Sequence, residues 1–324
     1  SEMSHFIFGG SGFIGTHLIA LIDNLYPGTR IYNLDIVENN HEGKSTYINC
    51  DVRSEINIDI PVTSEDVIFN FAAVHRTPGH PDQAYFETNI RGAENVCAFA
   101  EKFGVKRIVF TSSIAPYGAA EDLKTEKTLP TPNTPYGISK LVAEKIHAIW
   151  QAKKTNERQL TIVRPGVVFG KGENGNFTRL YWGIRGGKFF YPGRKDTIKA
   201  CIYVKELVRF MLYRLENHSE GVELYNCTFE PAFTIEQIVE TMKKVTGLQR
   251  AIVKVPGSLL MTVASIVGPL GGKALGICPA RVKKLMISTN ICGKKLADSG
   301  YKFHYTFEEA IKDWYRDNDN LYLR

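Results

Sequence analysis

Three patterns are missing from this 324-residue sequence, and each absence excludes a class of protein. The six cysteines are scattered without a Cys-x-x-Cys pair, which argues against a zinc site or a disulfide framework and suits a reducing compartment. No apolar run approaches the ~20 residues that a membrane-spanning helix needs. A strand pattern begins at His5, so we expect no signal peptide. We therefore expect a cytoplasmic protein without a metal, and the modest net charge of +6 gives no reason to expect nucleic acid as a partner.

Acidic residues are absent from one long segment. Between Arg250 and Ala297 there is no Asp or Glu, whereas eight Lys and Arg residues frame an apolar stretch, PGSLLMTVASIVGPLGG, at residues 256–272. We favour the interpretation that this stretch is a core helix beside a site for a diphosphate. The alternative is a surface that rests on anionic lipid.

Strand and helix patterns alternate through the first half of the chain. Short apolar runs predict strands (HFIFGG, RIYNLD, VIFNFAA, KRIVFTSS and LTIVRP), and the longer segments between them have apolar residues at helical spacing. Short apolar strands separated by helices are typical of parallel sheets that are covered on both faces. We therefore predict an α/β fold with a doubly wound parallel sheet of the Rossmann type. Beyond Pro165 the alternation breaks down, and we expect a smaller C-terminal α/β lobe that binds the substrate.

A glycine pattern follows the first predicted strand. FIFGGSGFIGTHL places Gly9, Gly12 and Gly15 where the backbone can turn tightly and approach a diphosphate at a helix N-terminus, although glycines also simply make turns. Asp35 ends the next strand, about 20 residues further on, where a carboxylate binds ribose hydroxyls and repels a 2′-phosphate. A solvated acid is the alternative for Asp35. We predict NAD rather than NADP, bound by Gly9, Gly12, Phe13, Ile14 and Asp35.

A hydroxyl pair and a Tyr-x-x-x-Lys pair point to proton transfer. FTSSIAPYG carries Ser113 at the end of a predicted strand, where open α/β sheets bind ligands. PYGISK places Tyr136 and Lys140 on one face of a predicted helix. A free tyrosine has a pKa near 10, but a nearby ammonium and a cationic nicotinamide both favour its phenolate. We predict that Ser113 holds a substrate alcohol, that Tyr136 is the base, and that Lys140 assists it.

Together with CDVR at 50–53, FNFAA at 69–73 and TN at 88–89, these motifs occur in the order and spacing of the extended short-chain dehydrogenase/reductase family. The chain resembles that family over nearly its whole length. The resemblance implies that Asp51 and Val52 border the adenine, that Ala72 and Ala73 pass close to the cofactor, and that Asn89 supports the active site. A plain turn residue is the alternative for Asp51, and a buried polar group at a helix end is the alternative for Asn89.

The residues after Ser113 separate the reactions of this family. Related dehydratases have an Asp-Glu pair there, whereas this chain has Ile114 and Ala115, which cannot carry a proton. The chain also resembles a bacterial subgroup that epimerises N-acetylglucosamine at C4 on UDP or undecaprenyl diphosphate. We expect an NAD-dependent 4-epimerase of a diphosphate-linked hexose or N-acetylhexosamine. A dehydrogenase or reductase of a keto-sugar or an apolar secondary alcohol, and a non-catalytic NAD sensor, are the alternatives.

Substrate contacts are expected outside the motifs. RPGVVFGKGENGNFTRL and GRKDTIKACIYVKEL resemble the segments that hold the diphosphate end in nucleotide-sugar 4-epimerases, and they contain Asn176, Arg194 and Lys199. Surface polar residues are the alternative for these three. His75 and Arg76 are further candidates, and a structural role is the alternative for His75. We predict an NAD-binding domain over 1–170, to which 198–228 return, and a substrate-binding lobe formed by 171–197 and 229–324. A homodimer is expected, and the sequence leaves the sugar and its carrier open.

Overall fold

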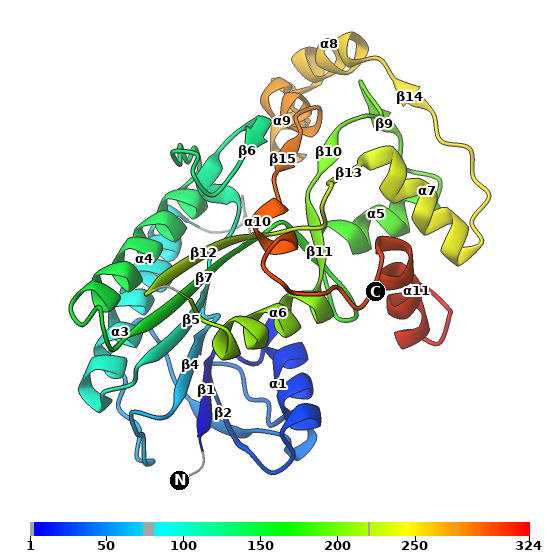
Figure 1. Ribbon diagram of the computed structural model, residues 1–324. Coiled ribbons are helices and arrows are strands. Elements are labelled where there is room, and N and C mark those ends of the chain that lie inside the picture. Colours follow the sequence, from blue (N-terminus) through cyan, green and yellow to red (C-terminus); the bar gives the residue numbers. More distant parts are fainter. Residues whose placement is uncertain (1–2, 74–80, 220, 276) are drawn as a thin grey trace.

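The computed structural model describes residues 3–73, 81–219, 221–275 and 277–324. Among these residues, seven parallel strands form the sheet of the larger lobe, in the order β12-β7-β5-β4-β1-β2-β3 (Figure 1). They are β1 (Ser4–Phe8), β2 (Arg30–Asp35), β3 (Thr46–Asn49), β4 (Val67–Asn70), β5 (Arg107–Thr111), β7 (Gln159–Pro165) and β12 (Val222–Cys227). The predicted doubly wound α/β fold is confirmed.

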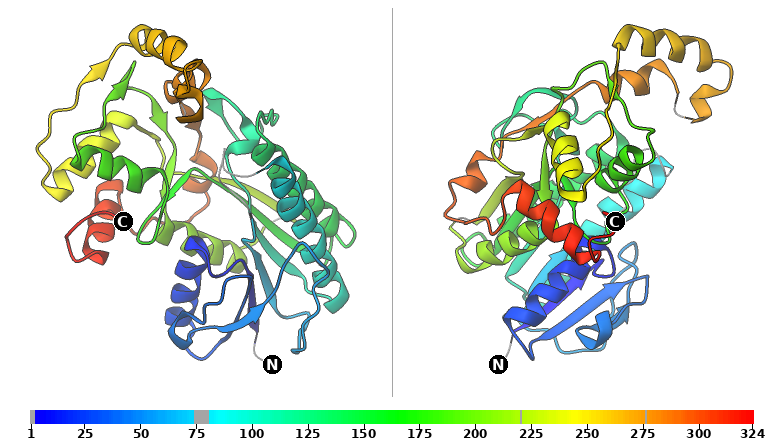
Figure 2. Two further views of the ribbon diagram at one scale, coloured as in Figure 1. Left: turned by 180° about the vertical axis from the view of Figure 1, so that it is seen from behind. Right: turned by 90° about the vertical axis from the view of Figure 1, so that its right-hand side faces the viewer.

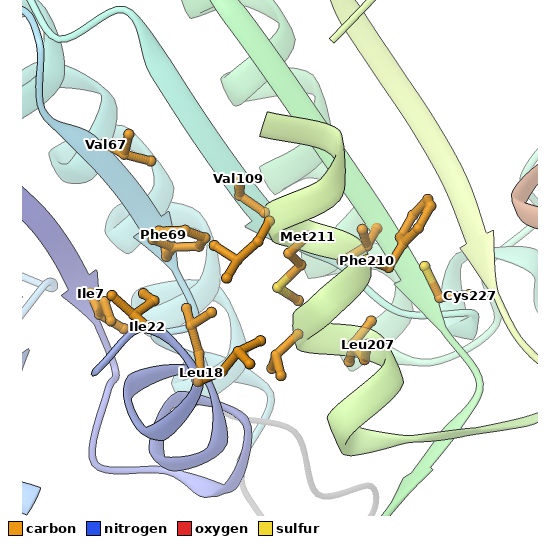
Figure 3. Close-up of a cluster of buried hydrophobic side chains, with 14 of the residues drawn as sticks. Ile7, Leu18, Ile22, Val67, Phe69, Val109, Leu207, Phe210, Met211 and Cys227 are labelled. Atoms are coloured by element: carbon orange, nitrogen blue, oxygen red, sulfur yellow. The ribbon is translucent and has the colours of Figure 1, made fainter. Parts of the chain in front are cut away.

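Helices cover both faces of this sheet. Ile7 and Phe69 pack with α1 and α6 on one face (Figure 3), whereas Phe6 and Ile68 pack with α3 and α4 on the other. Successive strand residues point to opposite faces, and both faces are buried, so the central strands β1, β4 and β5 each contain consecutive apolar residues. The covering helices are α1 (Phe13–Leu25), α3 (Arg91–Phe103), α4 (Pro135–Ala152) and α6 (Val204–Glu216).

The strand order reverses next to β1, which pairs with β2 on one side and with β4 on the other. In open α/β sheets ligands bind at the carboxyl ends of the strands at such a point. The glycine turn follows β1 and Ala72 follows β4, so the predicted cofactor residues lie at this edge of the sheet.

A second sheet, in the order β13-β10-β15-β6, organises the smaller lobe. Its strand β6 comes from the first half of the chain and pairs with β15, which the sequence patterns did not predict. β12 pairs with β7 in the large sheet, which supports our proposal that the chain returns there, whereas Lys199 in β10 pairs with β15 in the second sheet. The division into domains stays a proposal.

The remaining elements are short. α7 begins with a capping box formed by Thr234 and Gln237. The other strands are β6 (Ala120–Lys124), β8 (Val167–Phe169), β9 (Tyr191–Pro192), β10 (Ile198–Lys199), β11 (Cys201–Tyr203), β13 (Phe233–Thr234), β14 (Lys254–Val255) and β15 (Thr289–Ile291). The other helices are α2 (Asp82–Tyr85), α5 (Asn176–Arg185), α7 (Ile235–Thr246), α8 (Gly257–Val267), α9 (Pro279–Leu285), α10 (Lys294–Ala297) and α11 (Phe307–Asp317), with 3₁₀ turns η1 (His41–Gly43), η3 (Ala115–Tyr117) and η4 (Gly272–Leu275) and a π-helical turn η2 (Phe86–Ile90).

The apolar stretch of residues 256–272 does not form a core helix, and that prediction is wrong. Its helix α8 projects from the end of the smaller lobe (Figure 2), and of the residues in α8 only Ala264 is buried. Apolar composition does not specify what covers a helix, and no helix within the described ranges covers the outer side of α8. Of the helices in the described ranges, none has the length and apolarity to cross a bilayer.

Candidate active site

The glycine turn after β1 is shaped by close backbone contacts. Gly9 has φ +78°, which side chains with a Cβ rarely adopt, and a Cβ there would lie 2.7 Å from the backbone nitrogen of Ala72. A Cβ at Gly15 would lie 2.5 Å from the Cα of Gly10. At Gly12, by contrast, a Cβ would meet only the Gly9 carbonyl oxygen, at 3.4 Å. Gly9 and Gly15 therefore close the turn, and Gly12 leaves an open approach to α1.

The N-terminus of α1 suits a diphosphate. Gly12 caps the helix without a side-chain hydrogen bond, and the first turn contains no acidic residue. Such a helix end presents backbone N–H groups and a partial positive charge to an anion. The side chains of Phe13 and Ile14 pack against the hydrophobic cluster of the smaller lobe, so their predicted cofactor contacts would come from the backbone.

Asp35 is held beside the glycine turn. Its carboxylate accepts hydrogen bonds from the backbone N–H groups of Ser11 and Val37, both at 3.0 Å. A carboxylate has about four lone-pair sites, so capacity remains for ribose hydroxyls. The observed position fits the predicted contact with the adenosine ribose of NAD.

Replacing Asp35 with alanine is expected to weaken NAD binding by about 10-fold or more, because a hydrogen bond to a charged group contributes about 1.5–3 kcal/mol. The preference for NAD over NADP should narrow, since the carboxylate also repels a 2′-phosphate. Titration of both cofactors measures this, with Glu157→Ala as a control that removes an exposed carboxylate elsewhere. An unchanged affinity for NAD would show that Asp35 does not contact the ribose.

The residues predicted to border the adenine differ in exposure. Asp51 forms an exposed ion pair with Arg53 at 2.7 Å, and hydrogen bonds from Arg53 lower the pKa of the carboxyl. Val52 is buried, and its carbonyl accepts a hydrogen bond from the Asn95 side chain at 2.8 Å. A Cβ at Gly92 would lie 2.9 Å from the Val52 side chain, so the first turn of α3 packs tightly against this loop.

The segment after β4 contains two more predicted cofactor residues. The Ala72 N–H donates to the side-chain oxygen of Asn70 at 3.3 Å, which fixes the strand end opposite Gly9. Ala73 ends the described range, and the candidates His75 and Arg76 lie outside the described residues.

Ser113 and Tyr136 come together where β5 ends and α4 begins. Their side chains are joined by a hydrogen bond, and the Ser113 hydroxyl also accepts from the Ala115 N–H at 3.0 Å. The Thr134 hydroxyl caps α4 by accepting from the Gly137 N–H at 3.0 Å. A Cβ at Gly137 would lie 2.7 Å from the Ala115 carbonyl oxygen, so the start of α4 fits closely against the loop that carries Ser113.

The protein groups around Tyr136 keep its phenol protonated at neutral pH. Burial raises the pKa of Tyr136 to about 12, and the hydrogen bond with Ser113 only partly opposes this rise. The neighbouring Tyr85, whose ring lies 6.1 Å away, raises the pKa of Tyr136 further. A further positive charge near the phenol is therefore needed before Tyr136 can act as a base.

Lys140 lies one helical turn from Tyr136 but is held by the end of β5. Its ammonium donates to the Thr111 carbonyl at 2.9 Å and lies 5.0 Å from the centre of the Phe110 ring. Burial lowers the pKa of Lys140 to about 8, and Glu144 opposes this shift. Lys140 therefore keeps its charge at neutral pH, although in this structure it does not contribute to the pKa shift of Tyr136.

Asn89 supports the catalytic helix through a serine. Its side-chain amide donates to the Ser139 hydroxyl at 2.9 Å, and that hydroxyl donates to the Tyr136 carbonyl at 2.8 Å. Asn89 is buried in the π-helical turn η2, a kind of turn that is frequent at functional sites. Its position fits both interpretations of Asn89, and its role stays a prediction.

A buried polar network lies behind these residues, and the sequence analysis missed it. Glu144 accepts two hydrogen bonds from Arg164, at 2.6 and 2.9 Å, and one from the Ser112 hydroxyl at 2.5 Å. The Arg164 guanidinium lies 4.9 Å from the Tyr117 ring, whose hydroxyl donates to Asn226 at 2.7 Å. In the sequence, only the position of Glu144, one helical turn after Lys140, could have indicated that this side chain lies near the catalytic residues.

The three substrate candidates of the smaller lobe differ in their partners. Asn176 starts α5 and accepts from Arg179 at 2.6 Å. Arg194 forms ion pairs with Glu121 at 2.5 Å and Asp196 at 2.6 Å, so its charge is already compensated.

Lys199 has a less compensated charge. Among the described residues it forms no ion pair, and it donates a long hydrogen bond of 3.5 Å to the Ile287 carbonyl. Burial lowers the pKa of Lys199, and the nearby cation Lys284 lowers it further. Glu121 opposes this shift, and Arg194 adds to it. An anion would relieve this repulsion. The adjacent Ala200 packs in one cluster with Tyr117, and Ile114, the residue after Ser113, packs against the same cluster.

The family follows from a direct comparison. Residues 5–228 match the family model described as the NAD dependent epimerase/dehydratase family. The chain belongs to this family. This match, together with 33% identity to a bacterial sugar 4-epimerase over 94% of the chain, identifies an NAD-dependent sugar 4-epimerase of the extended short-chain dehydrogenase/reductase type, as the sequence analysis predicted.

Two relatives and one solved structure are similar to this epimerase over nearly its whole length. It is 33% identical over 308 residues to the N-acetyl-alpha-D-glucosaminyl-diphospho-ditrans,octacis-undecaprenol 4-epimerase of Escherichia coli O157:H7, covering 94% of this chain and 92% of the relative. It is 25% identical over 342 residues to the 3beta-hydroxysteroid-dehydrogenase/decarboxylase isoform 1 of Arabidopsis thaliana, covering 94% and 77%. The structure of the UDP-N-acetylglucosamine 4-epimerase from Bacillus cereus matches with a TM-score of 0.72 and 20% identity over 97% of this chain and 99% of that one, and so shows the same fold.

Proposed function

We propose that this epimerase inverts C4 of an N-acetylhexosamine that is carried on a polyprenyl diphosphate. The observation that carries the proposal is the half-buried, poorly compensated Lys199. Its ammonium reaches the Ile287 carbonyl just after α9, and α9 packs against the exposed apolar helix α8. A diphosphate suits the positive charge of Lys199, and a hydrocarbon chain suits the exposed apolar face of α8. The similarity to an E. coli enzyme named for an undecaprenol-linked substrate supports the same carrier.

The reaction requires removal and return of a hydride at C4, and bound NAD⁺ supplies the hydride acceptor and donor. The glycine turn, the start of α1 and Asp35 would hold this cofactor. Ser113 binds the 4-hydroxyl of the sugar, and Tyr136 takes the proton of that hydroxyl and later returns it to the oxygen. Lys140 keeps a positive charge beside the strand end, and Asn89 holds α4 in position through Ser139.

The neighbours of Ser113 favour epimerisation over elimination. Ile114 and Ala115 have no proton to transfer, so the loop offers no acid that could protonate a leaving hydroxyl. The site is therefore suited to return the hydride to the opposite face of the ketone. A net dehydrogenase remains the second candidate, and it would release the ketone and accumulate NADH.

An assay with two carriers tests the proposal. N-acetylglucosamine linked to UDP and N-acetylglucosamine linked to a polyprenyl diphosphate in detergent micelles are offered side by side. We expect the C4 epimer to form from the polyprenyl-linked sugar with NAD remaining bound to the protein. Turnover of the UDP-sugar alone would contradict the proposed carrier, and net formation of NADH would contradict epimerisation.

We further propose that the enzyme is a homodimer that works at the inner face of the membrane, where a polyprenyl-linked sugar would be found. Light scattering of the purified protein tests the dimer.

A further inference from the structure

The outer face of α8 carries a row of exposed apolar side chains. Leu259, Val263 and Ile266 follow one another at helical spacing and are 53%, 44% and 61% exposed, and Leu270, just beyond the helix, is 81% exposed. We call these four residues the α8 ridge. The opposite face, with Ala264, packs against α9. The helix thus leaves one apolar face uncovered, beside a stripe of exposed hydroxyl residues: Ser258, Thr262 and Ser265.

Cations without carboxylate partners precede and follow α8 in the chain and lie on α9, the helix that packs against it. Lys254 immediately precedes the helix in β14, Lys273 follows it in η4, and three more lie on α9. We call the set the basic collar: Lys254, Lys273, Arg281, Lys283 and Lys284. All five are exposed, and none takes part in an ion pair formed among the described residues. Exposed apolar side chains can enter the outer part of a bilayer, and unpaired cations before, after and beside the same helix can bind anionic lipid headgroups.

The same unit is joined to the candidate diphosphate site. The Ile198 N–H donates to the Ser288 hydroxyl at 2.9 Å, and the adjacent Lys199 reaches the Ile287 carbonyl. A Cβ at Gly193 would lie 2.5 Å from the sulfur of Met286, so the end of α9 packs directly on the loop before β10. The part of the basic collar that lies on α9 is therefore next to β10, the strand that carries Lys199.

We infer that the α8 ridge and the basic collar dock the enzyme on an anionic lipid leaflet, with the diphosphate of the substrate near Lys199 and its hydrocarbon chain beside α8. This inference rests on the proposed polyprenyl carrier. A second copy of the chain is a poorer occupant, because a two-fold contact through this face would set one basic collar against another. Figure 2 shows α8 at the extremity of the molecule, where a flat surface can reach it.

Sedimentation of the full-length enzyme with phosphatidylcholine–phosphatidylglycerol vesicles, without substrate, tests the docking surface. We expect binding at low salt that weakens at high salt and on pure phosphatidylcholine. Lys273→Gln with Arg281→Gln should weaken binding roughly 5-fold for each cation removed. Leu259→Ser with Ile266→Ser should weaken it by on the order of 10-fold for each residue, through lost apolar contact.

A control pair, Lys302→Gln with Leu321→Ser, removes an exposed cation and an exposed apolar side chain far from α8 and should sediment like the wild type. A wild-type protein that stays in the supernatant at both salt levels would overturn the inference. So would a dimer that dissociates in the α8 variants, which would identify a second copy as the occupant. Activity on the micellar substrate separates the two proposals, because failure there with intact vesicle binding contradicts the carrier and not the surface.

Discussion

Tyr136→Phe is expected to lower the rate of epimerisation by at least ~10²-fold, the lower end of the contribution of general acid–base catalysis. The substitution removes the hydroxyl that moves the proton and that bonds Ser113, but it keeps the ring beside Tyr85. Bound NAD should therefore remain in the purified variant. Rates are measured under saturating substrate, together with the NAD content and the melting temperature of the protein.

The pH dependence gives this prediction a second readout. Because the pKa of Tyr136 is about 12 in the unliganded site, the phenolate fraction grows as the pH rises through the neutral range. The wild-type rate should rise with pH over this range, by an amount set by how far bound NAD⁺ lowers that pKa. The residual rate of the variant should lack this rise.

Tyr85→Phe is the matched control, since it alters a neighbouring phenol and leaves Tyr136 in place. Its rate should stay much closer to that of the wild type. Near-normal turnover by Tyr136→Phe would show that another group carries the proton.

Much of the larger lobe could be predicted because its strands are buried on both faces. A strand such as β1 is then buried at every residue and contains the consecutive apolar residues Phe6, Ile7 and Phe8, and the helices between strands show their own period. β6 could not be found this way. Its sequence AEDLK is largely exposed and polar, and it is a strand only because β15, far along the chain, pairs with it.

The catalytic residues could be predicted because they are close in sequence or lie at strand ends. Tyr136 and Lys140 share one helix, and Ser113 follows β5 directly. The network behind the catalytic residues could not be predicted, because its members lie on different elements. Glu144 on α4 pairs with Arg164 on β7. Asn226 accepts a hydrogen bond from Tyr117, which lies 109 residues away in the chain. Polar residues of this kind give no pattern until the sheet order is known.

Glu144→Gln is expected to have the largest effect on stability of the substitutions considered, with a loss of about 3–5 kcal/mol in the free energy of unfolding. The side chains of Glu144 and Arg164 are only 4% and 3% exposed. The substitution leaves the buried guanidinium without a counter-charge, and the network with Ser112 loses its charged acceptor. Urea unfolding at a fixed NAD concentration measures the loss, because bound cofactor adds to the apparent stability.

Two further variants separate the burial of this pair from its charge. Glu308→Gln removes one member of an exposed pair with Lys244 and should change stability far less, since solvent already screens that interaction. The double variant Glu144→Leu with Arg164→Met replaces both buried charges by apolar groups, and it should recover part of the stability lost in Glu144→Gln. A double variant at least as unstable as the single one would mean that the hydrogen bonds of the network, rather than the compensation of a buried charge, hold α4 and its Tyr136 against β5 and β7.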